Sequence, residues 1–147
     1  MRKSLRKFIL ELPGANSYCE CQFPCSKIEI EHVYPKSLLK AKLDKKLFAK
    51  ANQNPHNLYK CCSYLNRKKS SLLLGEPYVR DEFNGMLARA CLYMDYTYNL
   101  NNTDRTISTW TNYSLLYPPF PFEYERSKKI YEYTGSSNIF IDLYMRD

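Results

Sequence analysis

The sequence predicts an α+β domain in which a strand-containing first part is followed by a mostly helical second half. Residues 28–33 alternate β-branched and polar side chains, which is typical of a strand with one buried face. From Phe83 to Tyr98, apolar residues recur three or four positions apart, as they do on one side of a helix. The length of 147 residues suits one domain with its own core, so we expect residues 1–147 to form a single domain.

The first half is expected to contain a strand, a long excursion and a return strand. Pro35 should end the strand over 28–33, because proline cannot donate to a ladder. Residues 37–51 are rich in Lys and Leu and are expected to be helix or loop. The turn-forming residues 53–57 then precede a short return strand over 58–60.

The rest of the chain is expected to be helical, with one interruption. A helix over 63–74 should end at Gly75, and another should end at Gly135, because glycine is favoured just after a helix. The remaining expected segments are helix at 83–98 and around 107–113, irregular chain at 117–121, and helix at 122–134.

Positive charge is concentrated in one stretch of the chain. The formal net charge is +7, yet residues 36–69 hold ten Lys and Arg and one acidic residue, Asp44. This concentration favours a face that binds a polyanion such as nucleic acid. The alternative is a lysine-rich solvated surface.

The N-terminus has a basic start, but Glu11 and Pro13 interrupt the apolar run that a secretory signal needs. No stretch approaches the roughly 20 apolar residues of a membrane span. We therefore expect an intracellular protein that does not enter the membrane. We also expect a monomer.

The pair Glu31-His32, near the end of the expected first strand, suggests hydrolytic chemistry. Phosphodiester hydrolysis needs a base for water and a cation for the developing negative charge. His titrates near neutral pH and can act as the base, while Glu and Asn oxygens suit Mg²⁺. Since adjacent strand residues point to opposite faces, both side chains can reach one phosphate only if the strand ends, twists or bulges there.

Several motifs resemble those of the endonuclease I family, which has a ββα-metal (HNH-type, His-Me finger) active site. Residues 30–37, Ile-Glu-His-Val-Tyr-Pro-Lys-Ser, resemble its EHV-x-P-x-S segment. His56-Asn57-Leu58 matches its HNL motif. Leu65-Asn66, followed by Lys69-Ser70, is similar to VN-x-x-RS. Residues 85–94, 123–126 and 135–142 are similar to its later motifs, in the family's order.

The resemblance implies a ββα-metal core over about 28–74, supported by additional helices over 79–142. It also implies a metal-dependent endonuclease that hydrolyses DNA, or RNA, with little sequence specificity. His32 would be the general base, Asn57 would orient it, and Glu31 and Asn66 would hold Mg²⁺, or Mn²⁺ or Ca²⁺. The residues expected to contact substrate phosphates are Lys36, Arg67, Lys68 and Lys69.

The sequence departs from the family around the substrate. Asn54-Pro55 stands before HNL where the family commonly has an acidic residue, and the segment between EHV and HNL is short. A phosphate-binding Arg is therefore missing there. The lysines of residues 40–50 can replace it only as point charges, without the two-pronged grip of Arg.

The cysteines allow two interpretations. The first is a structural Zn²⁺, because Cys21-x3-Cys25 has a spacing that suits zinc. The second pair, Cys61 and Cys62, is adjacent in sequence, which is poor chelate geometry. Disulfides are the other, if the compartment is oxidising. Cys91, within a helix, is expected to be a buried thiol. The zinc ligands would be Cys19, Cys21, Cys25 and Cys62.

Two other functions remain open. One is a noncatalytic nucleic-acid-binding module on a decayed nuclease fold; the other is a zinc-stabilised interaction domain. Some residues have purely structural interpretations: Arg89 is expected to be a buried ion-pair partner, with Glu123 as its candidate, and Trp110 is expected in the core.

Overall fold

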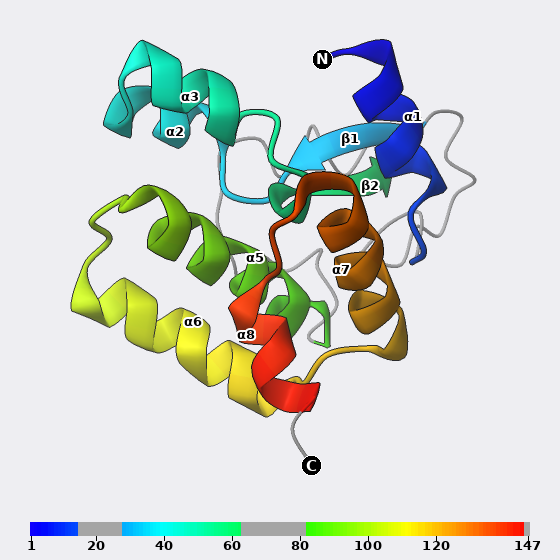
Figure 1. Cartoon of the computed structure of the whole chain (residues 1–147). Helices are drawn as coiled ribbons and strands as arrows, with labels where there is room; N and C mark the ends of the chain where they lie inside the picture. Colours follow the sequence, from blue (N-terminus) through cyan, green and yellow to red (C-terminus); the bar gives the residue numbers. More distant parts are fainter. Residues whose placement is uncertain (15–27, 63–81, 146–147) are drawn as a thin grey trace.

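The computed structural model describes residues 1–14, 28–62 and 82–145 (Figure 1). Helix and strand are mixed and helix predominates, which is consistent with the expected α+β class. In chain order the elements are α1 (Lys3–Glu11), β1 (Ile28–His32), α2 (Lys36–Lys42), α3 (Lys45–Ala51), the 3-10 turn η1 (Pro55–Asn57), β2 (Leu58–Cys62), α5 (Phe83–Tyr98), α6 (Asp104–Leu116), α7 (Pro121–Thr134), α8 (Ile139–Asp142) and η2 (Leu143–Met145).

The two strands form an antiparallel pair that the chain closes only after a long excursion. Ile28 lies opposite Cys62, and His32 lies opposite Leu58. Between the strands, residues 33–57 form α2, α3 and η1. The expected strands are therefore present, and the Lys/Leu-rich segment between them folds as two short helices, the second capped by the Asp44 side chain.

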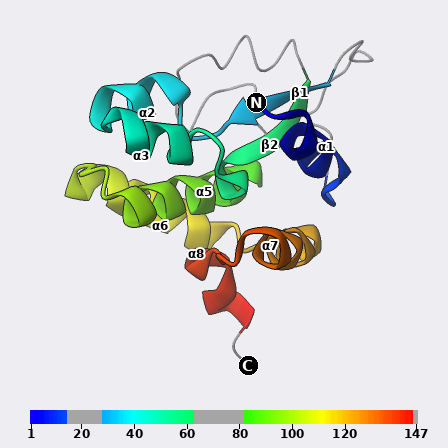
Figure 2. The same cartoon turned by 45° about the horizontal axis from the view of Figure 1, so that its top comes forward.

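The two faces of the strand pair are covered by different helices. Ile30 and Leu58 pack with the apolar side of α1, together with Ile130 of α7. Tyr59 and Cys61, on the other face, belong to the main core around α5. The strand pair is therefore a layer between α1 and α5, as Figures 1 and 2 show from two directions.

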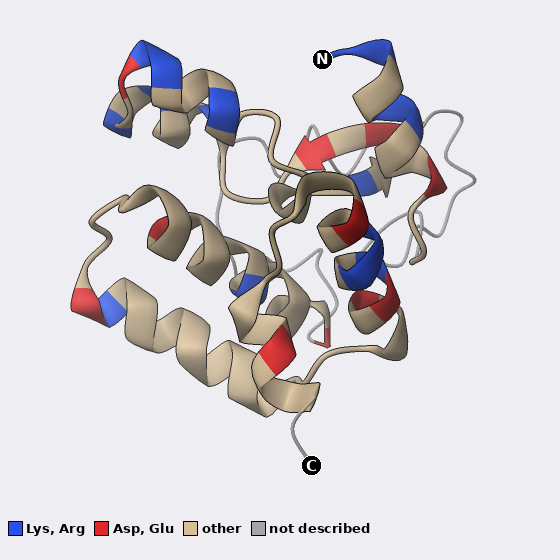
Figure 3. Cartoon of the chain, viewed as in Figure 1, with Lys and Arg blue, Asp and Glu red and all other residues tan. Residues whose placement is uncertain are grey.

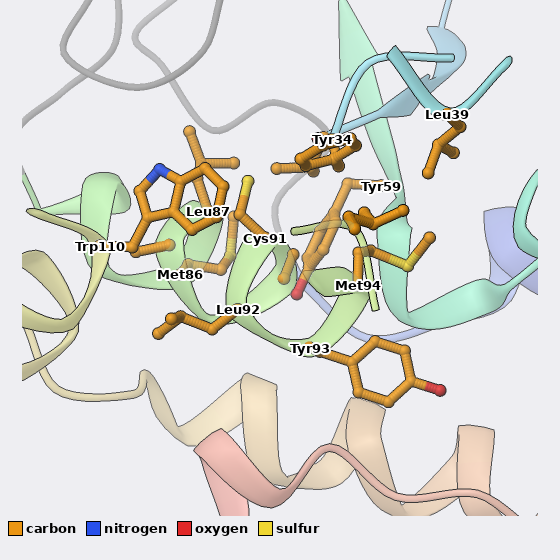
Figure 4. Packing of buried hydrophobic residues seen from close by; sticks show 14 of the residues in the cluster. Tyr34, Leu39, Tyr59, Met86, Leu87, Cys91, Leu92, Tyr93, Met94 and Trp110 are labelled. Atoms are coloured by element: carbon orange, nitrogen blue, oxygen red, sulfur yellow. The ribbon is translucent and has the colours of Figure 1, made fainter. Parts of the chain in front are cut away.

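Helix α5 is the centre of the main core. Every residue from Phe83 to Met94 is buried, so this helix meets other parts of the protein on all sides. Figure 4 shows side chains of α5 beside Tyr34 of the excursion, Tyr59 of β2 and Trp110 of α6. Trp110 is 2% exposed, as expected for a core residue.

A buried ion pair joins α5 to α7. The Arg89 guanidinium donates to both carboxylate oxygens of Glu123, over 2.8 and 2.7 Å, and both side chains are inaccessible to solvent. Arg89 also donates to the carbonyl oxygens of Ser114 and Tyr117, and Glu123 accepts from the backbone N–H of Phe120. The expected pairing is confirmed, and it ties the start of α7 to the end of α6.

The observed helix ends agree best with the expected ones where a residue such as glycine marks the end of the helix. Helix α5 spans the expected residues, and α7 ends at Gly135, whose φ of 80° suits glycine. Helix α6 is longer than the expected 107–113, beginning after a Thr103 cap. The helix expected over 63–74 lies outside the described residues. Among the described helices, none is long and apolar enough to cross a membrane.

We predict that Glu123→Gln lowers the free energy of unfolding by about 3–5 kcal/mol, because it leaves the Arg89 charge buried without a counter-charge. Urea denaturation measures the effect. Glu125→Gln, an exposed neighbour on the same helix, is the control and should change stability by less than about 0.5 kcal/mol. Equal urea midpoints for Glu123→Gln and Glu125→Gln would show that the Arg89–Glu123 ion pair does not stabilise the protein.

Candidate active site

The end of β1 places Glu31 and His32 on opposite faces of the strand pair. Both residues keep regular partners, Glu31 opposite Tyr59 and His32 opposite Leu58. Alternation therefore directs Glu31 toward the α5 side, where it is 3% exposed, and His32 toward the α1 side, where it is half-buried. The two side chains can act together only around the end of the strand, where it gives way to the excursion.

The His32 ring is oriented by a backbone carbonyl. Its Nε2 lies 2.9 Å from the carbonyl oxygen of Asn52, the residue directly after α3. A carbonyl can only accept, so Nε2 carries a hydrogen and, in the neutral ring, the basic lone pair is on Nδ1. This tautomer leaves Nδ1 as the atom that can take a proton.

Asn57 holds the start of the excursion to its end. Its Oδ1 accepts from the N–H of Tyr34 at 2.7 Å, and its Nδ2 donates to the carbonyl of Tyr34 at 3.0 Å. Its backbone carbonyl also accepts from the N–H of Val33. These bonds fix the chain directly after His32, so Asn57 acts on His32 through the backbone.

Three further side chains hold residues 54–58, which we call the 54–58 turn. The Asn54 amide donates to the hydroxyls of Tyr93 and Tyr98 on α5. His56 donates from Nε2 to the carbonyl of Ser136 at 2.9 Å. Arg126 of α7 donates to the carbonyls of Pro55 and Leu58, and its guanidinium lies 3.7 Å from the centre of the Tyr59 ring. The turn is therefore bonded to α5, α7 and the segment after α7.

The two histidines occupy different environments. His56 is 1% exposed, and its ring lies against Tyr93. Burial lowers the pKa of His56 to about 4, partly offset by the hydrogen bond to Ser136, and the nearby Arg126 charge lowers it further. His56 is therefore neutral near pH 7 and has a structural role, whereas His32 is half-buried and keeps part of its surface open to solvent.

The lysines of α2 and α3 form an exposed basic surface, and Figure 3 shows them along these two helices. His32 lies beside this surface, because its ring is hydrogen-bonded to the carbonyl of Asn52, directly after α3. Asp44, which caps α3, is the one acidic residue in these helices. Lys42 differs from the rest, because its ammonium donates to the Leu100 carbonyl and the Asn102 side chain. The other lysines of this surface are exposed and make no such bond; they are Lys36, Lys40, Lys45, Lys46 and Lys50.

Lys60, also counted in the basic stretch, does not belong to this surface. Its ammonium donates to the carbonyl of Leu12 at 2.8 Å, and burial lowers its pKa. Its role is to attach the end of α1 to β2. Among the described residues, the basic stretch of the sequence is therefore divided in space into an exposed part on α2 and α3 and a structural part at Lys60.

Several predicted site residues lie outside the described residues. They are Asn66, Arg67, Lys68 and Lys69, and the cysteines Cys19, Cys21 and Cys25; Cys62 ends β2, but its side chain is not described. Cys91 is buried, as expected. Within the described ranges, no three His, Cys, Asp or Glu side chains come together as a metal-binding group. This finding does not bear on the expected pair of metal ligands, because Glu31 and Asn66 supply one carboxylate and one amide, not three such side chains.

The comparisons with protein-family models and with curated proteins found no match to this chain.

Some residues that shape the site gave no sequence signal of this role. Asn52 acts through its backbone carbonyl, so its side-chain type carries no information about the contact with His32. Tyr34 likewise contributes its backbone to Asn57. Asn54, in contrast, precedes a proline and has the side chain of a turn cap, and its bond to the N–H of His56 follows that rule.

We predict that Asn57→Ala lowers the free energy of unfolding by about 2–4 kcal/mol, because it leaves the N–H and carbonyl of Tyr34 buried without partners. Amide hydrogen exchange should also become faster at Tyr34 than in the wild type. Asn112→Ala, on the exposed side of α6, is the matched control. Unchanged protection of the Tyr34 amide would show that Asn57 does not hold the loop.

We also predict that acid destabilises the protein through His56. The unfolded state binds this proton near pH 6.5 and the folded state only near pH 4, so the stability that neutral His56 contributes is lost as pH falls between those values. The loss at pH 4 should approach about 3 kcal/mol. Urea midpoints measured from pH 7 to pH 4 should fall less for His56→Gln, which keeps a donor for Ser136. If the urea midpoints of the wild type and of His56→Gln fell equally with pH, His56 would be excluded as the cause.

Proposed function

We propose that this protein is a metal-dependent endonuclease that hydrolyses phosphodiester bonds of DNA with little sequence specificity. The observation that carries the proposal is the half-buried His32 ring, fixed by the Asn52 carbonyl next to the lysine surface of α2 and α3. A base with a defined basic nitrogen beside clustered cations is the arrangement that attack on a backbone phosphate requires. The finer ββα-metal fold, with its helix over 63–74, belongs to this proposal.

His32 would act as the general base. Its Nδ1 takes a proton from a water molecule, and the resulting hydroxide forms a new bond to phosphorus. The bond from phosphorus to the 3′ oxygen breaks, and that oxygen takes a proton from solvent. The products are a 5′-phosphate and a 3′-hydroxyl, as the family resemblance implies.

Glu31 would hold the metal together with Asn66. Carboxylate and amide oxygens are the hard ligands that Mg²⁺ takes, and Mg²⁺ retains several waters when the protein supplies few ligands. Glu31 fits this role by its chemistry and its position at the end of β1. A bound cation would stabilise the negative charge that develops on the phosphate oxygens.

The lysine surface would bind substrate. Lys36 lies at the start of α2, four residues after His32, and it is exposed. Lysine ammonium groups act as point charges toward phosphates and read no base edges. A surface of this kind favours binding of any nucleic-acid sequence, which supports low specificity. Arg67, Lys68 and Lys69 would add to it.

A noncatalytic nucleic-acid-binding module is the second candidate. It is favoured by the opposite directions of Glu31 and His32, because the proposed metal ligand and the proposed base lie on different faces of the strand pair. Such a module would bind DNA in a salt-sensitive way and would not cleave it, whichever divalent metal is supplied.

We predict that the wild type nicks plasmid DNA with Mg²⁺ or Mn²⁺ and leaves it intact in excess EDTA. His32→Ala should lower turnover by at least about 100-fold, the usual contribution of a general base, while DNA binding in EDTA stays near the wild-type value. Added imidazole should restore part of the lost turnover, because it supplies a replacement base.

Ser108→Ala, on the exposed side of α6, is the control and should keep full activity. Cleavage by His32→Ala at the wild-type rate would remove His32 from the mechanism. Binding without cleavage, by the wild type with every divalent metal tested, would favour the noncatalytic module.

A further inference from the structure

Helix α1 is a second basic element, separate in sequence from α2 and α3. One side of α1 is apolar and buried against the strand pair, where Leu5, Ile9 and Leu12 are 5%, 1% and 3% exposed. The other side is exposed and strongly basic, with Glu11 as its acidic residue. The exposed cations of this segment are Arg2, Lys3, Arg6 and Lys7.

The fold brings α1 next to the candidate active site. Helix α1 packs on the strand face that carries Ile30 and Leu58. His32 lies on this same face, two residues after Ile30 and opposite Leu58. Asn52, at the end of α3, contacts His32 from another direction. The end of β1 therefore lies between two groups of basic helices, with α1 at one end of this face and α2 and α3 at the other, as Figures 1, 2 and 3 agree.

The chemistry of these helices selects the kind of partner. A membrane surface is disfavoured, because the apolar side of α1 is already buried and cannot enter a bilayer. Proteins that bind single-stranded nucleic acid offer aromatic rings on which bases stack. Among the described residues of α1, α2 and α3, none of the exposed side chains is aromatic. Phe8 of α1 is half-buried and its ring stacks on Tyr133.

We propose that α1 is a second phosphate-binding element, and that a double-helical nucleic acid lies across the end of β1, in contact with α1 on one side and α2 and α3 on the other. A duplex presents two rigid rows of phosphates, which clustered cations on fixed helices can contact without access to the bases. This inference rests on the proposed function for the location of the substrate, but binding tests it without any cleavage.

The experiment measures affinity for a 20-base-pair DNA duplex in EDTA over a series of salt concentrations. Two double variants, Lys3→Gln with Lys7→Gln and Arg2→Gln with Arg6→Gln, each remove two cations from α1. If both cations contact phosphates, the slope of log affinity against log salt becomes shallower by about two. The matched control, Arg105→Gln with Lys128→Gln, removes two exposed cations of α6 and α7 and should leave the slope unchanged.

The outcomes separate this inference from the proposed function. Wild-type slopes in both α1 variants would overturn the inference, whether or not the protein cleaves DNA. Shallower slopes in at least one α1 variant, with the control unchanged, would support it even if no metal gives cleavage. A single-stranded 20-mer bound as tightly as the duplex, at every salt concentration, would overturn the choice of a double helix.

Discussion

The geometry around His32 depends on one side chain, Asn57, which closes the excursion between the strands. Its amide is bonded to both backbone groups of Tyr34, so residues 33 and 34 cannot move independently of the 54–58 turn. The same excursion contains Asn52, whose carbonyl orients the His32 ring. Because both contacts come from one closed loop, the position of the ring is set by the loop as a whole. A change in Asn57 would therefore reach His32 without touching it.

The helical second half provides what this loop needs to stay in place. Arg126 is buried and donates to two carbonyls of the 54–58 turn, and burial lowers its pKa, a sign that its charge has left water. Placing a cation there is costly unless its donors are satisfied, and the turn's carbonyls and the Tyr59 ring partly do so. Helix α7 is in turn fixed by the Arg89–Glu123 pair. The C-terminal helices thus support the site although they contribute none of its proposed catalytic groups.

The elements that could be predicted from sequence are those whose signals are local. Helix α7 ends at Gly135 because glycine accepts the φ that ends a helix, and that rule needs no knowledge of the rest of the fold. Helix α1 was not predicted. Its apolar residues are covered by Leu58 and Ile130, which are distant in sequence, so the segment suggested only an interrupted signal region. The alternation of Glu31 and His32 could be foreseen from the strand period, but the Asn52 contact could not, because a backbone carbonyl is the same in every residue.

Because Glu31 and His32 point to opposite faces of the strand pair, the two side chains of the candidate site have different surroundings. An ionised carboxylate that is 3% exposed needs a hydrogen-bond donor, a cation or a metal to offset its lost hydration, so burial alone is compatible with both a structural and a ligating Glu31. His32 is different, because it keeps part of its surface open to solvent, whereas the structural His56 is deeply buried. In the proposed function, this half-buried imidazole with a fixed tautomer, between two basic helical elements, would meet a solvated, negatively charged substrate. The distinction between an enzyme and a binding module therefore depends on what His32 does, more than on where Glu31 lies.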